Sequence, residues 1–470
     1  MNATTPHPNS ISFRAIVGWF LVAVLSFHVA YTFPPVSFLM AVFVFALVRL
    51  SHARSTRIVV RVGLLLGLAL YGPQLDFFWT IFGPAAIALW VVLAFWLAAF
   101  LGTLHQCRAR FGMVAAAVLA PLLWLGFEFF RGELYYLRFT WLNVGYAFFS
   151  QPALLSLFGV YGIGFVLMAV AAAVNAHPRR ATALALMLVI TGGLAFAVQV
   201  PLLRRGFGVA PSGQVIRVAA VQLEFPAERQ IVPVLEQLRR DHPDTELFVL
   251  SEYTFDGPVP KFVTDWCRQH QKFLIAGGKE ELPDKTFYNT AFVIGTNGEV
   301  VFQQAKSVPI QFFKDGLPAP DQKLWRSPWG DLGICICYDL SYTRVTDAFI
   351  RAGAQALIVP TMDVVDWGEH QHELHARVAP VRAAEYGVPI LRVASSGISQ
   401  LVMANAEVTA TAPFALEEAR IIGGLSLVQR GRVPWDRAVA RVAVGLTALV
   451  IVWLLAVAVL GWMNRRKKTA

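Results

Sequence analysis

Long apolar segments constrain this chain more than any other feature of its sequence. A membrane-spanning helix needs about 20 mostly apolar residues, and about eight stretches come near that length. They lie at residues 13–31, 35–50, 58–82, 85–104, 112–130, 153–175, 181–201 and 439–463. Only 15% of the residues are charged, against roughly 25% in soluble proteins. We therefore predict an α-helical membrane bundle over residues 1–201 and one further span at 439–463.

Basic residues in the short loops predict the orientation of these spans. If the N-terminus is cytoplasmic, the loops richest in Lys and Arg fall on the cytoplasmic side, as the positive-inside rule requires. These residues are Arg49, Arg54, Arg57, Arg108, Arg110, Arg179, Arg180, Arg465, Arg466, Lys467 and Lys468. We therefore expect a multi-pass membrane protein with both termini in the cytoplasm and residues 202–438 on the outer side of the membrane. In a Gram-negative cell, this outer side of the bacterial inner membrane is the periplasm.

Residues 215–431 have the pattern of a water-soluble domain. Short β-rich runs such as VIRVAAVQL and ALIVPT alternate with helical patterns, for example at residues 259–272 and 372–387. The Asn297-Gly298 pair between two strand-like runs predicts a β-hairpin. This alternation is typical of a layered α/β or mixed α+β domain.

Three residues of this domain could carry chemistry, although each also has an ordinary structural interpretation. Cys337 follows an apolar run and could be a nucleophile at a strand end, but a free cysteine among isoleucines is more often part of the core. Glu252 ends ELFVLSE and could be a general base or a solvated charge. Lys306 could stabilise an oxyanion and lower the pKa of a nearby thiol, but a single lysine is usually a surface residue.

Three other kinds of site are not predicted. Much of the net charge of +10 lies in membrane loops, so no nucleic-acid interface is expected. The four cysteines form no disulfide framework, and the spacing of Cys335 and Cys337 is poor for a disulfide. His372 and His375 could share a helix face, but no fourth zinc ligand is evident. We expect neither a metal nor a cofactor.

Glu252, Lys306 and Cys337 become specific in combination. The chain resembles the carbon–nitrogen hydrolase (nitrilase) superfamily in VLSE around Glu252, in YNTAFVIGTNGEVVFQQAK ending at Lys306, and in GICICYD around Cys337. That superfamily uses a Glu-Lys-Cys triad and folds as an α-β-β-α sandwich. The resemblance therefore implies this fold for residues 215–431 and catalytic roles for the three residues.

The layout of the whole chain resembles one family of that superfamily, the apolipoprotein N-acyltransferases. A multi-span half precedes a nitrilase-like domain and one terminal span, and FPPVSF, RFTWLNVGYAFFSQ and LLSLFGVYGIGFVLMAV are similar to family segments. The resemblance implies transfer of an acyl chain from a phospholipid to the N-terminal amine of a lipidated apolipoprotein cysteine. The reaction would pass through a thioester on Cys337 and need no cofactor. We expect a monomer.

The same resemblance implies roles for further residues. Tyr338 and Asp339 would support the nucleophile and the oxyanion, Tyr338 through its backbone N–H. Substrate contacts are expected at Trp141, Phe312, Trp367 and His375.

Two loops depart from the family pattern. Counting from Lys306 places the family's second glutamate at Lys314, and Asp315 could replace it only if the loop shifts. Residues 361–368 keep only the Asp and Trp-Gly of the family's run. Two alternatives follow, namely a membrane-tethered amidase or acyltransferase with another acceptor and an inactive lipid-binding scaffold. A transporter is not favoured, because charges within the spans are sparse and no broken-helix repeat is visible.

Overall fold

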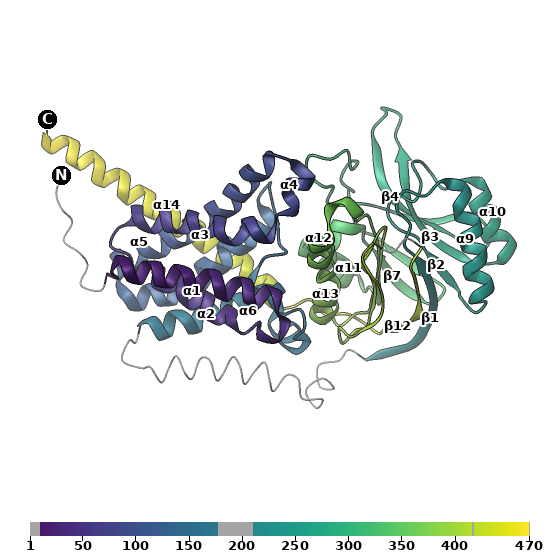
Figure 1. The fold of residues 1–470 in the computed structure, drawn as a ribbon, viewed down its shortest axis with the longest axis horizontal. Helices are drawn as coiled ribbons and strands as arrows, with labels where there is room; N and C mark the ends of the chain where they lie inside the picture. The colour runs from purple at the N-terminus through teal and green to yellow at the C-terminus, as the bar shows by residue number, and fades with distance from the viewer. Residues whose placement is uncertain (1–9, 177–209, 416–417, 470) are drawn as a thin grey trace. The chain divides into compact units, whose positions relative to one another are not determined.

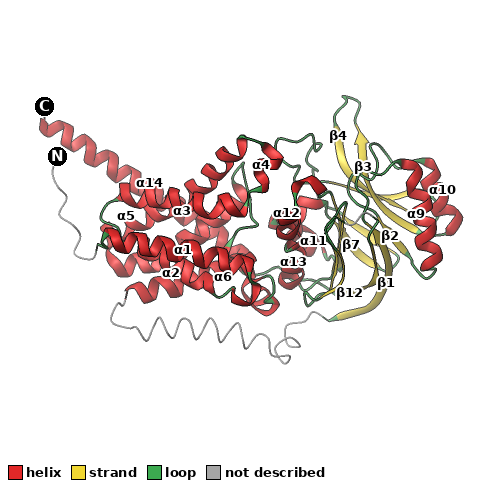
Figure 2. Cartoon of the chain, viewed as in Figure 1, coloured by secondary structure: helices red, strands yellow, loops and turns green. Residues whose placement is uncertain are grey.

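The computed structural model describes residues 10–176, 210–415 and 418–469. The chain divides into two compact units. The membrane unit comprises Met1–Val200 and Trp435–Ala470, and the α/β unit comprises Pro201–Pro434. Figures 1 and 2 show that the first consists of helices and the second of strands with helices around them.

Five helices among the described residues are long and apolar enough to cross a membrane. Two of them begin at serine caps, because the hydroxyl oxygens of Ser12 and Ser55 accept backbone N–H groups of the first turn. The helices of the membrane unit are α1 (Phe13–Thr32), α2 (Leu39–Leu50), α3 (Thr56–Gln74), α4 (Phe77–Phe82), α5 (Ala85–Phe129), α6 (Pro152–Ala176) and α14 (Asp436–Thr469). Helix α2 and the one-turn α4 are too short to belong to the five.

The predicted span 58–82 is wrong as a single helix. Helix α3 ends at Gln74, and the carboxylate of Asp76 accepts the N–H of Phe77 at 2.9 Å at the start of α4. A charged residue that caps a helix start satisfies an otherwise unpaired N–H group.

Two further predicted spans meet within one element. Helix α5 covers both 85–104 and 112–130, but its backbone leaves helical geometry at Gly112, where φ is 82°. Glycine tolerates this conformation because it has no Cβ. The predicted span 181–201 lies outside the described residues, so the total of eight stays a prediction.

Two six-stranded sheets form the centre of the α/β unit, with the orders β12-β1-β2-β3-β4-β5 and β11-β10-β9-β8-β7-β6. Strands β1, β2 and β3 run parallel to one another, as do β7, β8 and β9. The strands are β1 (Pro211–Val221), β2 (Leu247–Val249), β3 (Phe273–Glu281), β4 (Phe287–Ile294), β5 (Val300–Ala305), β6 (Leu324–Ser327), β7 (Gly330–Ile334), β8 (Ala356–Thr361), β9 (Ile390–Ala394), β10 (Ser399–Val402), β11 (Val408–Ala412) and β12 (Arg420–Val428).

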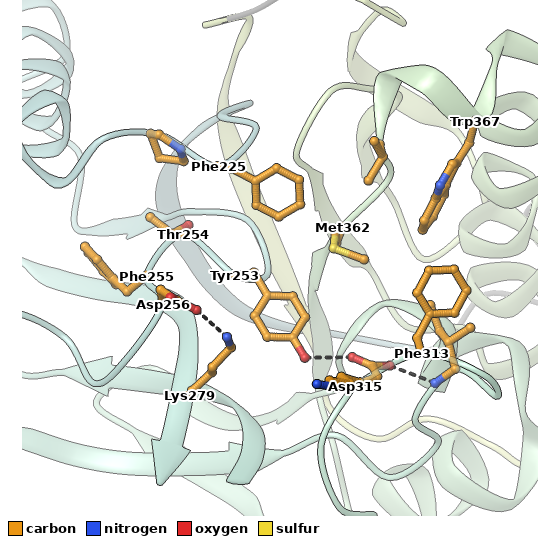
Figure 3. A pocket seen from close by; sticks show the side chains of 14 residues that line it. Phe225, Tyr253, Thr254, Phe255, Asp256, Lys279, Phe313, Asp315, Met362 and Trp367 are labelled. Carbon is orange, nitrogen blue, oxygen red and sulfur yellow. Dashed lines mark hydrogen bonds and ion pairs between the residues drawn. The ribbon is translucent and has the colours of Figure 1, made fainter. Parts of the chain in front are cut away.

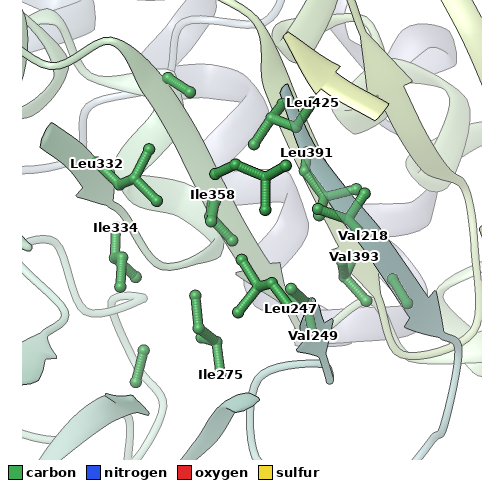
Figure 4. Packing of buried hydrophobic residues seen from close by; sticks show 14 of the residues in the cluster. Val218, Leu247, Val249, Ile275, Leu332, Ile334, Ile358, Leu391, Val393 and Leu425 are labelled. Atoms are coloured by element: carbon green, nitrogen blue, oxygen red, sulfur yellow. The ribbon is translucent and has the colours of Figure 1, made fainter. Parts of the chain in front are cut away.

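The two sheets pack face to face through an aliphatic core (Figure 4). Val218 and Ile275 of the first sheet meet Ile358 and Leu391 of the second, and all four are fully buried or nearly so. Helices α9 and α10 lie on the outer side of the first sheet, and α11 and α13 on that of the second (Figure 1). The helices are α9 (Glu228–Asp241), α10 (Lys261–His270), α11 (Thr343–Ala352), α12 (Glu369–Ala376) and α13 (Val378–Tyr386). The α-β-β-α order implied by the resemblance is therefore present.

The hairpin prediction is confirmed, whereas one predicted strand is too long. Strands β4 and β5 pair antiparallel, and Gly298 in their connection has a φ of 79°. The run LGICICYDL, in contrast, stays extended only to Ile334. The carboxylate of Asp339 accepts the N–H of Ile336 at 3.2 Å, and Cys337–Ser341 form a 3-10 turn. A side chain that bonds to the backbone in this way competes with the sheet ladder.

Candidate active site

Three strand ends bring Glu252, Lys306 and Cys337 into one region of the α/β unit. Glu252 follows β2, Lys306 follows β5 directly, and Cys337 follows β7. Each of the three residues is at most 2% exposed. A buried charge is costly unless it is paired and hydrogen-bonded, so the partners of these groups determine what they can do.

Lys306 lies between two carboxylates. Its Nζ is 2.8 Å from Oε1 of Glu252 and 2.7 Å from Oδ2 of Asp315. Asn289 of β4 links the same two acids, because its Nδ2 donates to Glu252 Oε1 at 2.6 Å and to Asp315 Oδ1 at 2.8 Å. Burial lowers the pKa of Lys306, but Asp315 and Glu252 raise that pKa well above its ordinary value. The lysine is therefore charged, and its position is fixed from two sides.

Cys337 and Glu252 are tied to the same neighbour, Met362. The Met362 N–H donates to Oε2 of Glu252 at 2.7 Å, and the Met362 carbonyl oxygen is 3.6 Å from Sγ of Cys337. Cys337 has a φ of 52° at the start of its turn. A non-glycine residue in this conformation is strained, and such strain concentrates at functional sites. The geometry suits an activated nucleophile that a tight turn presents next to a base.

Burial and the neighbouring charges favour the protonated form of the Cys337 thiol. Burial raises the pKa of Cys337 well above its ordinary value, and the negative charge of Glu252 raises it further. Lys306 lowers that pKa, as expected, but its effect is outweighed. Burial also raises the pKa of Glu252, with Lys306 opposing the shift. A thiol with a high pKa needs a base to remove its proton during attack, and Glu252 is the carboxylate that shares Met362 with it.

Asp339 joins the cysteine turn to the lysine loop. Its carboxylate accepts the N–H groups of Ser307, at 3.0 Å, and of Val308, at 2.7 Å, as well as that of Ile336. Burial raises the pKa of Asp339 to about 6, although these hydrogen bonds oppose the shift. An ionised carboxylate only accepts hydrogen bonds, so Asp339 supports the two loops and does not donate to an oxyanion. The Tyr338 ring packs edge-on against Tyr342 at 4.9 Å.

A pocket of about 600 Å³ adjoins these residues (Figure 3). Tyr253 and Asp315 form part of its wall and are joined by a hydrogen bond of 2.8 Å from the tyrosine hydroxyl. Met362 also lines the pocket, so the residue that touches both Glu252 and Cys337 reaches it. Most other walls are apolar or carry a charge at the rim: Phe225, Pro226, Thr254, Phe255, Asp256, Lys279, Ile310, Phe313, Lys314, Val364 and Trp367.

Two family models match this chain. Residues 20–173 match the apolipoprotein N-acyltransferase N-terminal domain, and residues 236–433 match the carbon–nitrogen hydrolase. The chain belongs to the apolipoprotein N-acyltransferase family, within the nitrilase superfamily. The first match lies in the membrane unit and the second in the α/β unit.

Similar proteins cover most of the chain. Apolipoprotein N-acyltransferases of Shewanella oneidensis and Methylococcus capsulatus are 25% and 24% identical to it, over 70% and 78% of this chain and 73% and 78% of their own lengths. The crystal structure of Saccharomyces cerevisiae Nit3, a member of branch 10 of the nitrilase superfamily, aligns with 45% of this chain and 90% of its own. That alignment has 21% identity and a TM-score of 0.39.

The second acidic residue that contacts Lys306 is Asp315, and not the residue at position 314. Its carboxylate contacts Lys306 and also accepts the N–H of Ile310 at 2.7 Å, whereas Lys314 is exposed on the pocket wall. Phe312 and Gly316 have φ angles of 71° and 81°, so the loop bends on both sides of Asp315 and residue counting fails. An inactive scaffold, which the lysine at position 314 had suggested, is not favoured.

His375, an expected substrate contact, belongs to a cluster of buried side chains, and its contact with substrate stays a prediction. Its Nδ1 is 2.8 Å from Oδ1 of Asp363, and Oδ2 of the same carboxylate pairs with Arg392. Burial lowers the pKa of His375, and Asp363 opposes the shift. His372 bonds instead to the Gly368 carbonyl oxygen at 2.8 Å. Asp363 follows Met362 directly, so we infer that this cluster positions the residue between Glu252 and Cys337.

The other expected substrate contacts have different surroundings. Trp367 lines the pocket and its ring lies 6.1 Å from that of Phe313. Phe312 is 69% exposed and does not line this pocket, whereas the adjacent Phe313 does; the substrate contact at Phe312 stays a prediction. Trp141 belongs to the membrane unit and is buried against Phe139 at 5.3 Å.

Three residues at the site were not singled out from the sequence. Asn289, Tyr253 and Met362 all contact the candidate triad or Asp315. Asn289 lies inside the motif YNTAFVIGTNG, which was the one available signal. The Met362 contacts involve backbone atoms, which no side-chain pattern reports.

Proposed function

We propose that this protein transfers an acyl chain from a phospholipid to the α-amino group of a lipidated N-terminal cysteine on an apolipoprotein. The observation that carries the proposal is the buried Glu252–Lys306 pair beside Cys337, in a chain that matches both parts of the N-acyltransferase family. The five long apolar helices support a reaction between lipid-anchored substrates.

In the first half-reaction, Glu252 accepts the proton of the Cys337 thiol as Sγ attacks the ester carbonyl carbon of the phospholipid. The tetrahedral oxyanion is stabilised by the Lys306 ammonium and by the backbone N–H of Tyr338. The bond between the carbonyl carbon and the glycerol oxygen then breaks. That oxygen takes the proton from Glu252, lysophospholipid leaves, and a thioester remains on Cys337.

In the second half-reaction, the acceptor amine attacks the thioester carbonyl carbon. Glu252 accepts a proton from the amine and returns it to Sγ as the carbon–sulfur bond breaks. The products are an amide on the acceptor and a free Cys337 thiol, so donor and acceptor react in turn. Burial of the site favours the amine over water as the nucleophile.

Asp315 and Asn289 make this cycle compatible with a fixed lysine. Glu252 becomes neutral whenever it holds a proton and then binds Lys306 less strongly. Asp315 contacts Lys306 at 2.7 Å independently of that proton. Lys306 therefore keeps its place and its charge through both half-reactions.

We further propose eight spans in a bacterial inner membrane, with both termini in the cytoplasm and the α/β unit in the periplasm. The distribution of Lys and Arg between the loops supports this orientation. In that arrangement the reacting groups of both lipid-anchored substrates are on the same side of the membrane as the α/β unit. Fusion of a reporter that is active only in the periplasm, inserted at Gly213, tests the orientation.

Mass spectrometry of the purified full-length protein tests the chemistry. Incubation with dipalmitoyl phosphatidylglycerol should add one palmitoyl mass, and a lipopeptide with a free S-diacylglyceryl cysteine should remove it. The added mass should be absent in Cys337→Ser and present in Cys335→Ala, a matched control at a neighbouring buried thiol. An acyl mass that persists in Cys337→Ser would contradict the proposal.

A further inference from the structure

Lys314 is a charged side chain on the pocket wall. It lines the 600 Å³ pocket and is exposed. Among residues 210–415 and the other described parts, its ammonium has no hydrogen bond or ion pair. The other charges of this wall are paired, Lys279 with Asp256 (Figure 3) and Asp315 with Lys306. The pocket therefore presents one spare positive charge.

The position of Lys314 is determined by the residue that follows it. Asp315 is held by Tyr253, Asn289, Ile310 and Lys306, with distances of 2.7–2.8 Å. The backbone at Lys314 is therefore anchored beside Asp315, whose carboxylate contacts Lys306. This distinguishes it from an ordinary surface lysine, whose backbone and side chain have no fixed relation to a site.

The chemistry of the proposed substrates indicates what this charge would bind. They bring an ester, alkyl chains, an amine and a phosphate, and only the phosphate is an obligatory anion. It lies one glycerol unit from the scissile ester, so it stays near the pocket when the ester reaches Cys337. Phe313 and Trp367 offer apolar surface on the same wall for the rest of the lipid. Lysine binds phosphate well as a point charge.

We propose that Lys314 forms a phosphate-binding subsite that holds the phosphodiester of the acyl-donor lipid during acylation of Cys337. The inference rests on the proposed function, because it takes the donor to be a phospholipid. Lys314 is in this view a specificity-determining residue, which favours phospholipid over a neutral ester lipid with the same acyl chains.

A binding measurement tests the subsite without any acyl transfer. The full-length Cys337→Ala protein in a neutral detergent is titrated with dihexanoyl phosphatidylglycerol and, separately, with dihexanoylglycerol. Adding Lys314→Ala should raise the Kd for the phospholipid about fivefold to tenfold, because one charge-assisted contact is lost. The Kd for the neutral lipid should stay within about twofold. Lys314→Arg should retain most of the preference.

A matched control and a second anion make the result specific. Lys261→Ala removes an exposed lysine that pairs with Asp265 on α10, away from the pocket, and should change neither Kd. Inorganic phosphate that displaces the phospholipid from the Lys314 protein, but not from Lys314→Ala, shows that the anion alone is recognised. Inorganic phosphate could also fail to displace the phospholipid while the protein still binds phospholipid more tightly than the neutral lipid. The subsite would then recognise the phosphate only as part of the lipid headgroup.

Three outcomes would overturn the inference. Lys314→Ala could weaken the binding of both lipids equally, as expected if Lys314 had only a structural role. It could also leave the binding of both lipids unchanged. It could also spare the phospholipid and weaken only a lipopeptide with acidic side chains, which would assign Lys314 to the acceptor. If Lys314→Ala does not fold, Lys314→Gln answers the same question. If the protein without any substitution gains no acyl mass on Cys337 when it is incubated with phospholipid, the proposed function itself is contradicted.

Discussion

The ammonium of Lys306 lies 2.7 Å from the carboxylate of Asp315, although residue counting places Lys314 at that position. Asp315 thus supplies the second negative charge around the lysine, and both groups are almost completely buried. Breaking a buried pair leaves an uncompensated charge, which costs more than the pair contributes. We infer that Asp315 positions Lys306 and does not touch the reacting atoms.

Asp315→Asn should slow acylation of Cys337 by about 100-fold, because Lys306 loses one of the two groups that orient it. The variant keeps a side chain of similar size and one hydrogen-bond acceptor. The effect is measured as the rate of acyl-enzyme formation, by quenching the reaction at set times and analysing the protein by mass spectrometry. Asp321→Asn, at a largely exposed aspartate on the same stretch of chain, should leave the rate unchanged. Equal rates in all three proteins would exclude the positioning role.

The acid limb of the pH profile should report Glu252. Burial and Asp315 raise the pKa of Glu252 above its ordinary 4.5, and Lys306 opposes them. Glu252 cannot accept the thiol proton once it is protonated, so activity is lost as the pH falls through this raised pKa. Asp315→Asn removes one charge that raises the pKa and should shift the acid limb of kcat/KM to lower pH. A shift to higher pH would contradict this assignment.

The candidate triad could be predicted because Glu252, Lys306 and Cys337 each lie in a motif that resembles the nitrilase superfamily. That resemblance implied a joint role for the three residues, although β2 and β5 belong to one sheet and β7 to the other. The support around them could not be predicted in the same way. Asn289 points from the middle of β4, and its two acceptors come from loops 37 and 26 residues away in the chain.

Loop geometry was the main obstacle to the rest of the site. Residue counting pointed to Lys314, but the loop has a positive φ at Phe312, and the phenylalanine in the sequence gives no sign of that conformation. In the membrane unit, the lengths of apolar runs predicted helices but not their breaks. The break at Asp76, where the carboxylate accepts the N–H of Phe77 at the start of α4, could not be read from the length of the apolar run.

Asn289→Asp should abolish acylation, with a loss of about 100-fold or more. The substitution keeps the shape but replaces the donor to Glu252 and Asp315 by a third acid in the same buried space. The extra charge would raise the pKa of Glu252 and pull Lys306 away. Asn297→Asp is the matched control, since its exposed side-chain oxygen accepts the Glu299 N–H and an aspartate can do the same. Acylation by Asn289→Asp at the unaltered rate would count against the bridge.

Trp367→Ala should raise the KM for the phospholipid about tenfold and change kcat much less, because the ring lines the pocket and touches none of the three candidate catalytic residues. The KM rises because the variant loses apolar surface that contacts the lipid equally in the ground state and in the transition state. Phe312→Ala removes an exposed aromatic ring of the neighbouring loop that does not line the pocket, so its KM should match that of the unaltered protein. Steady-state kinetics over a range of donor concentrations separates the two variants. A fall in kcat at constant KM for Trp367→Ala would instead mean that the ring acts in the chemical step, and a raised KM for Phe312→Ala would extend the donor site beyond this pocket.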